Sequence, residues 1–216
     1  MIENLNTIIS DINQLKYFNK QLTALEIVDV LSDIKHRIFP RPFERLSAIS
    51  KCSNLTGVEI GVAGGEHALS ILENLDIKRL YLVDPYDLYD TYTEGKEIYG
   101  ISQATLNETK KSAREKLKKY ERQIVWIEKQ SSKAISDIND NLDFVYIDGN
   151  HAYDFVFEDL HKYYNLIRPG GVLGGHDYYN GFAKSHSGLI KAVGEFASTF
   201  NLELTVEMPD FWFDLV

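Results

Sequence analysis

The sequence predicts an α/β fold built on a doubly wound, mostly parallel β-sheet. After residue 55, short runs rich in β-branched and aromatic residues alternate with helical patterns. The later prolines fall beside these apolar runs rather than inside them. Alternating strands and helices imply right-handed crossovers and a sheet that is covered on both faces. The last two expected strands are joined by a turn too short for a crossover, so they must be antiparallel.

The expected elements follow from these patterns in chain order. Before Pro40, apolar residues recur at steps of three and four, which predicts two helices in an accessory segment, residues 1–50, ahead of a main domain at 51–216. Five strands are expected in the main domain, at 57–60, 80–84, 124–128, 142–148 and 171–176. Helical patterns lie between them at 66–75, 103–120 and 153–167. A helix at 189–200 then precedes a hairpin of strands 202–207 and 211–216. The complete prediction is a Rossmann-like seven-stranded sheet with a C-terminal antiparallel hairpin and an N-terminal helical cap.

Charge and composition exclude several classes of function. The chain of 216 residues has 32 acidic and 23 basic residues, a formal charge of −9. Such a surface disfavours nucleic acids and anionic membranes. Cys52 is the only cysteine, so neither an internal disulfide nor a cysteine-built zinc site can form. Residues 1–10 lack a signal-peptide pattern, and no apolar run reaches the roughly 18 to 20 residues of a membrane span. We therefore expect a cytoplasmic protein that acts on a small molecule, with N-terminal helices that can cover the site or form a homo-oligomer.

A glycine-rich turn follows the first expected strand, where such sheets bind ligands. It holds Gly61, Gly64 and Gly65, but not in the spacing that dinucleotide-binding folds place under a pyrophosphate, which disfavours an NAD oxidoreductase. Glu59 precedes the turn and disfavours an anionic group nearby. Asp84 ends the second strand 23 positions after Gly61, where a carboxylate can accept hydrogen bonds from ribose hydroxyls; alternatively, it caps the following turn. An adenosine without phosphates, as in S-adenosylmethionine, fits both features.

Four motifs together resemble class I S-adenosylmethionine-dependent methyltransferases. They are Val58–Gly65, Leu82–Tyr86, Phe144–His151 and Leu166–Val172. The likeness is to a small-molecule O-methyltransferase branch, similar to methyltransferase family 24, whose fourth strand ends in Asp-Gly-x-His. The resemblance implies a cofactor site in which Glu59, Gly61 and Gly65 lie by the methionine part, Asp84 holds the ribose, Tyr86 lies along the adenine, and Asp148 borders the cofactor. Ser131 and Ser132 follow the third strand, where the family often has Gly-Asp-Ser and this chain has Gln130-Ser131-Ser132.

The chemistry is expected at the ends of the fourth and fifth strands. Adjacent parallel strands would bring Asp148 and Asp177 together, and with His176 these residues can hold a divalent cation such as Mg²⁺ or Mn²⁺. A cation would lower the pKa of a substrate hydroxyl. His151 is the candidate general base, or completes the ligand set, so the expected catalytic residues are Asp148, His151 and His176. In the alternative interpretation, Asp148 caps a helix and His176 is a core histidine.

These observations predict a methyltransferase that acts on a hydroxyl of a small molecule, a sugar or a polyhydroxylated compound. The tyrosine-rich stretch 86–99 is long for a connection and suits a lid over the acceptor. Two alternatives stay open: a metal-dependent enzyme of the same fold that transfers no methyl group, and a non-catalytic module that binds an adenosine ligand.

Overall fold

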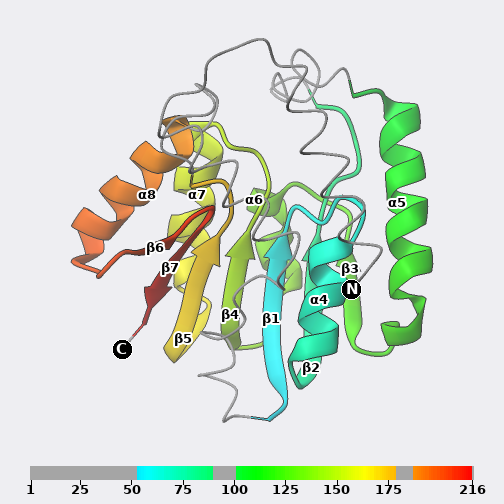
Figure 1. Cartoon of the computed structure of the whole chain (residues 1–216), viewed down its shortest axis with the longest axis horizontal. Coiled ribbons are helices and arrows are strands. Elements are labelled where there is room, and N and C mark those ends of the chain that lie inside the picture. Colours follow the sequence, from blue (N-terminus) through cyan, green and yellow to red (C-terminus); the bar gives the residue numbers. More distant parts are fainter. Residues whose placement is uncertain (1–52, 90–100, 179–186, 216) are drawn as a thin grey trace, which may run out of the picture.

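A computed structural model of the chain describes residues 53–89, 101–178 and 187–215 (Figure 1). The expected helical cap at residues 1–50 and most of the expected lid at 86–99 lie outside the described residues.

The described strands form one seven-stranded sheet in the order β3-β2-β1-β4-β5-β7-β6 (Figure 1). Strands β1 to β5 pair in parallel, whereas β7 is antiparallel to both β5 and β6. The strands are β1 Leu55–Ile60, β2 Ile77–Val83, β3 Ile124–Ile127, β4 Leu142–Ile147, β5 Ile167–Gly175, β6 Thr205–Glu207 and β7 Asp210–Asp214. The order and the directions confirm the predicted Rossmann-like sheet and its C-terminal hairpin.

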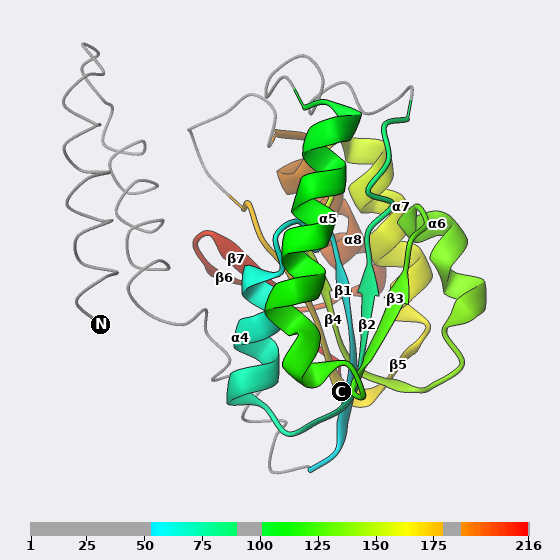
Figure 2. The ribbon, with the colours of Figure 1, turned by 90° about the vertical axis from the view of Figure 1, so that its right-hand side faces the viewer.

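Helices cover both faces of the sheet (Figure 2). They are α4 Glu66–Asn74, α5 Gln103–Leu117, α6 Ser131–Ala134, α7 Tyr153–Tyr164 and α8 Ser187–Phe200, with short 3₁₀ turns at Lys118–Tyr120 and Ile135–Asp137. One hydrophobic core lies under α4 and α5 and includes Ile71 and Leu117. The other lies under α7 and α8 and includes Leu160 and Phe196. None of the helices in the described ranges has the length and apolar character that a membrane crossing requires.

Strand β1 positions the site. All six residues of β1 are buried, because β1 lies between β2 and β4 and is covered on both faces. The chain winds one way from β1 to β3 and the other way from β4 onward, so the carboxyl ends of β1 and β4 meet where the winding reverses. In doubly wound sheets this is the position at which ligands bind.

The element boundaries differ from the prediction by up to four residues, and the largest difference is at β5. β5 begins at Ile167 rather than at residue 171, because Ile167 already pairs with Leu142 before a register shift. The preceding helix, α7, accordingly ends at Tyr164. The four-residue helix α6 was not predicted, since a single turn is too short to show helical periodicity.

Candidate functional site

A cavity of about 290 Å³ lies at the carboxyl ends of the parallel strands. Residues that follow four strands line it: Gly61 after β1, Asp84 after β2, Ser131 after β3 and Asp148 after β4. It therefore occupies the position where the winding reverses, as the sequence predicted.

Gly61 allows the ends of β1 and β4 to approach closely. Its φ is +83°, and a Cβ atom there would lie 2.0 Å from the carbonyl oxygen of Asp148. The amide of Asp148 donates to the carbonyl of Ile60 at 2.7 Å, and the amide of Gly61 donates to Val83 at 2.9 Å. Gly65, at φ 79°, precedes the first residue of α4. The glycine turn thus shapes one wall of the cavity.

Asp84 holds the glycine turn and also lines the cavity. Its Oδ2 accepts hydrogen bonds from the amides of Val62 and Ala63, both at 3.0 Å, and its Oδ1 accepts from the amide of Tyr86 at 2.9 Å. Burial raises the pKa of the carboxyl, against the effect of these three hydrogen bonds. The structure therefore shows the turn-capping role, and the position on the cavity wall is compatible with ribose binding as well.

Tyr86 lies in the hydrophobic core as well as on the cavity wall. Its side chain is 3% exposed, and its hydroxyl donates to the carbonyl of Ala63 at 2.8 Å. Burial, with the nearby Asp84 carboxyl, raises the pKa of the phenol. The side chain of Gln103 in α5 holds this segment, because its amide donates to the carbonyl of Tyr86 at 2.9 Å and its oxygen accepts from the amide of Leu88 at 3.0 Å.

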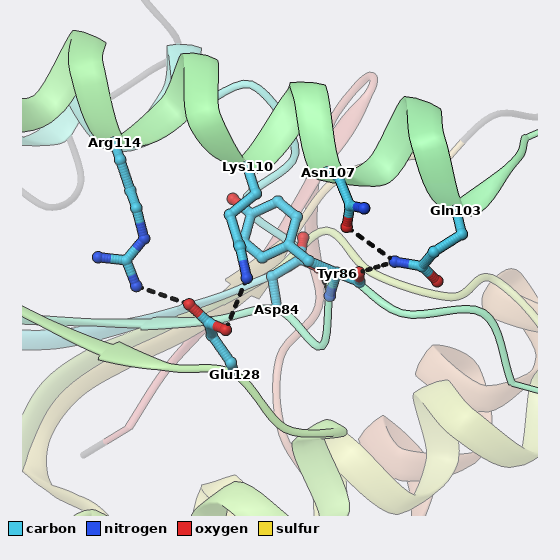
Figure 3. A network of polar contacts seen from close by, with 7 residues as sticks. All are labelled: Asp84, Tyr86, Gln103, Asn107, Lys110, Arg114 and Glu128. Atoms are coloured by element: carbon cyan, nitrogen blue, oxygen red, sulfur yellow. Dashed lines mark hydrogen bonds and ion pairs between the residues drawn. The ribbon is translucent and has the colours of Figure 1, made fainter.

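A charged network supports this wall from outside (Figure 3). Lys110 and Arg114 of α5 donate to the carboxylate of Glu128, at 2.9 and 2.6 Å. These hydrogen bonds lower the pKa of Glu128. Glu128 in turn contributes to the raised pKa of Asp84. The network thus joins α5 to the residue that directly follows β3.

Glu59 lies in a buried polar network rather than among the residues that line the cavity. It is 1% exposed, and its Oε1 is 3.1 Å from Nδ1 of His67. The His67 ring packs on Tyr146 with 4.0 Å between centroids, and the Tyr146 hydroxyl donates to Asp210 at 2.7 Å. The network stabilises the end of β1 that carries the glycine turn.

The four predicted catalytic and metal residues converge at the cavity edge. Nε2 of His151 lies 2.7 Å from Oδ2 of Asp177, and Nδ1 of His176 lies 3.0 Å from Oδ1 of Asp177. The same nitrogen of His176 is 3.7 Å from Oδ1 of Asp148. All four side chains are partly buried, and Asp148 also lines the cavity.

Asp177 is the centre of this group. Burial opposes ionisation of its carboxyl, but the hydrogen bonds from His151 and His176 outweigh burial and hold its pKa well below the usual range. Its backbone is left-handed, with φ 65°. Residues held in this sparsely populated region cluster at functional sites. The carboxylate is therefore ionised and fixed between two imidazoles.

One atom each from Asp148, His151 and Asp177 can be chosen so that all three lie within 4.8 Å of one another, which fits a divalent cation. The prediction named His176 as a ligand and His151 as the general base or a further ligand, and this arrangement uses His151. His176 instead contacts the second oxygen of Asp177 and can orient it. Two oxygens and one nitrogen suit Mn²⁺ or a softer ion better than Mg²⁺.

Asp159 is a cavity residue that the sequence analysis did not identify. It lies in α7, is 3% exposed and lines the cavity together with Gln130, Ser131 and Ser132. A usable signal was present, because Asp159 stands three residues after Val156 and next to Leu160, on the apolar face of the helical pattern. A carboxyl on a buried helix face calls for a specific reason.

The sheet order, the antiparallel last pair and the position of the cavity are those of the class I methyltransferase fold. The model of the methyltransferase domain family Methyltransf_24 matches residues 58–178, more than half of the chain. The chain belongs to this family of methyltransferase domains.

Similar solved structures share the fold. A putative caffeoyl-CoA O-methyltransferase from Staphylococcus aureus is 13% identical with a TM-score of 0.59, covering 99% of this chain and 100% of that chain. The O-methyltransferase NovP is 18% identical with a TM-score of 0.57 and 80% of each chain covered. SMU.1697c, a putative methyltransferase from Streptococcus mutans in complex with SAH, is 13% identical with a TM-score of 0.56, covering 82% of this chain and 99% of that chain. At these identities the likeness establishes the fold alone.

One relative is closer in sequence. Uncharacterized protein R132 of Acanthamoeba polyphaga mimivirus is 29% identical over 157 residues, which cover 67% of this chain and 64% of that protein. The match thus spans less than two thirds of that relative's length.

Proposed function

We propose that the protein transfers the methyl group of S-adenosylmethionine to a hydroxyl oxygen of a small molecule, a sugar or a polyhydroxylated compound. The observation that carries this proposal is the group formed by Asp148, His151 and Asp177, whose ligand atoms lie within 4.8 Å of one another beside the cavity. A hydroxyl needs a base or a cation before it can attack a methyl carbon, and this group can supply either.

The residues that line the cavity support S-adenosylmethionine as the methyl donor. A ligand with its ribose at Asp84 would extend one way toward Gly61 and Asp148, and the other way toward Ser131 and Ser132. Carboxyl groups at the Asp148 end suit a sulfonium cation. In this proposal Glu59 and Gly65 act indirectly, by holding the glycine turn. Tyr86 forms the cavity wall near the adenine.

The imidazole of His151 is placed to accept the hydroxyl proton. Asp177 lies 2.7 Å from its Nε2 and would stabilise the imidazolium that forms. When bound, S-adenosylmethionine supplies the methyl group. In the transfer, the bond between sulfur and methyl carbon breaks as the bond to the hydroxyl oxygen forms, giving a methyl ether and S-adenosylhomocysteine. Asp148 and His176 keep Asp177 and the acceptor in line.

A divalent cation at Asp148, His151 and Asp177 would lower the pKa of a bound hydroxyl and favour the oxyanion at neutral pH. The two modes exclude each other at the pair formed by His151 and Asp177, because a cation bound between them would replace the hydrogen that Nε2 otherwise donates to Asp177. Chelation therefore distinguishes them.

The test is methyl transfer from S-adenosylmethionine to a panel of hydroxyl compounds, with the methylated product identified by mass spectrometry. His151→Ala is expected to lower the rate by about 10² to 10⁴-fold. Asp177→Asn is also expected to lower the rate of methyl transfer. The control is Asp154→Asn, which changes an exposed carboxylate on α7. The assay is repeated after chelation and again after Mn²⁺ or Mg²⁺ is restored.

The outcomes separate the parts of the proposal. A product methylated on nitrogen or carbon would refute the hydroxyl acceptor. Activity that survives chelation but not His151→Ala would remove the cation and keep the base. Full turnover in the Asp148→Asn and Asp177→Asn variants would contradict both roles.

The division of the chain is also part of the proposal. Residues 51–216 would bind the methyl donor, while the segment 1–50 and the stretch 86–99 would cover the acceptor and select it. Deleting 1–50 should then leave binding of S-adenosylhomocysteine unchanged and abolish acceptor turnover.

A further inference from the structure

Asp159 presents a buried carboxyl to the cavity. Its side chain comes from α7 and is 3% exposed, on the same stretch of cavity wall as Ser131 and Ser132. The Ser131 side chain hydrogen-bonds to the carboxyl, whereas Oδ1 has no hydrogen-bond partner among the described residues. One oxygen is therefore buried with its capacity to accept a hydrogen bond unused.

The fold itself does not account for this oxygen. Lys162, a cation one turn along α7, is held by Glu158 at 2.5 Å, and both of those side chains are about 40% exposed. A buried oxygen without a hydrogen-bond partner costs about 1–3 kcal/mol of stability. An unpartnered polar atom on a cavity wall indicates a ligand that satisfies it.

The place of Asp159 along the cavity indicates which part of the ligand it would meet. The strand order β3-β2-β1-β4 places Ser131, Asp84, Gly61 and Asp148 in that sequence along the cavity, and Asp159 lies beside Ser131. With the ribose at Asp84 and the methyl group at Asp148, the base falls at the Asp159 end. The exocyclic amino group of adenine is a hydrogen-bond donor, and it needs an acceptor there.

We propose that the carboxyl of Asp159 accepts a hydrogen bond from the 6-amino group of the adenine and thereby selects the cofactor. This inference rests on the cofactor cavity proposed above and assigns a residue on α7 to base recognition. Ser131, which hydrogen-bonds to the same carboxyl, positions it.

The protonation state adds a second contact. Burial raises the pKa of Asp159 to about 7, and the neighbouring Glu158 acts in the same direction while Ser131 and Lys162 oppose it. Tyr163 on α7 and Tyr89 in the segment after β2 are the other titratable groups that interact with it. A neutral carboxyl can accept from the 6-amino group with one oxygen and donate to the ring nitrogen N1 with the other. The ionised form can only accept, so binding should weaken as the pH rises above about 7.

The experiment compares two ligands on three proteins by calorimetry. The ligands are S-adenosylhomocysteine and its purine analogue, which lacks the 6-amino group; the proteins are the full-length wild type, Asp159→Leu and Asp159→Asn. We expect the wild type to bind S-adenosylhomocysteine about five- to tenfold more tightly than the analogue. Asp159→Leu should bind both ligands equally, whereas Asp159→Asn, which keeps an acceptor oxygen, should retain the preference. Glu158→Gln is the matched control on the same helix.

Dependence on pH is the second measurement. The dissociation constant of S-adenosylhomocysteine should rise between about pH 6 and about pH 8 for the wild type and stay level for Asp159→Asn. A purely structural carboxyl would move neither the ligand preference nor this profile.

Equal preference for the amino group in the wild type and in Asp159→Leu would overturn the proposal. If Asp159→Leu does not fold, a wild type without preference, or an Asp159→Asn variant with an unchanged pH profile, would overturn it instead. Failure of the wild type to bind S-adenosylhomocysteine at all would refute the cofactor cavity, and so is distinguishable from a failure of Asp159 alone.

Discussion

Burial of Asp159 predicts a measurable dependence of stability on pH. Its pKa is raised from 3.8 to about 7 in the folded protein, so the native state holds a proton that the unfolded chain releases. The free energy of unfolding must therefore fall as the pH rises from about 4 to about 7. A shift of about three units at about 1.4 kcal/mol per unit corresponds to roughly 4 kcal/mol over the whole window. Between about pH 5 and about pH 8 the calculated loss is about 2.5 kcal/mol.

The perturbation is Asp159→Asn, which keeps the shape and removes the titration. Urea unfolding without ligand, followed by tryptophan fluorescence to which the buried Trp212 contributes, gives the free energy of unfolding of both proteins at each pH. Relative to the wild type, the free energy of unfolding of the variant should rise by about 2.5 kcal/mol as the pH rises from about 5 to about 8. Asp154→Asn, at an exposed position of the same helix, should show no such gain. A difference in the free energy of unfolding between Asp159→Asn and the wild type that stays the same at every pH would refute the claim that the fold keeps Asp159 protonated.

Two further predictions concern the scaffold of the site. Gly61→Ala should destabilise the protein by at least about 1–3 kcal/mol and weaken S-adenosylhomocysteine binding, because the residue has φ +83° and a Cβ atom would lie 2.0 Å from a backbone oxygen. The control is Gly194→Ala, where a Cβ atom meets nothing within 4 Å. This change should be neutral or stabilise the protein by about 0.5–1 kcal/mol. Tyr146→Phe removes the hydroxyl that donates to the buried Asp210 and should cost about 1–3 kcal/mol in denaturant unfolding. An unchanged midpoint of denaturant unfolding in Gly61→Ala or Tyr146→Phe would contradict the role given to these contacts.

The sequence was sufficient to predict the sheet because its evidence is repeated along the chain. The parallel strands contain buried, mostly apolar runs, such as Leu80–Val83 of β2, and each crossover is long enough for a helix. The terminal hairpin followed from the short turn between β6 and β7. The start of β5 could not be predicted, since Arg168 to Gly171 read as a turn and only pairing with β4 makes the segment part of a strand.

The site was predictable to the level of strand ends. Asp148 and Asp177 were expected to meet because adjacent parallel strands end at the same edge, and their ligand atoms do lie close together. The sequence left open which imidazole completes the group, since both His151 and His176 were candidates. His176 is the sequence neighbour of Asp177, yet the grouping of ligand atoms includes His151, which lies on another segment. Asp159 was not identified from the sequence because helical periodicity shows that a position is buried but not which cavity it faces.

The carboxyl groups around the cavity differ in how the protein treats them, and that difference is the basis of their separate proposed roles. Asp177 is kept ionised, since two imidazoles outweigh its burial, as a metal ligand or an imidazolium partner must be. Asp159 has the opposite environment: burial dominates, and it can present a neutral hydrogen-bonding edge to a base. Asp84 is fixed by three backbone amides, which suits a rigid contact with a ribose. A net charge of −9 therefore says little about the cavity until each carboxyl is placed in its own surroundings.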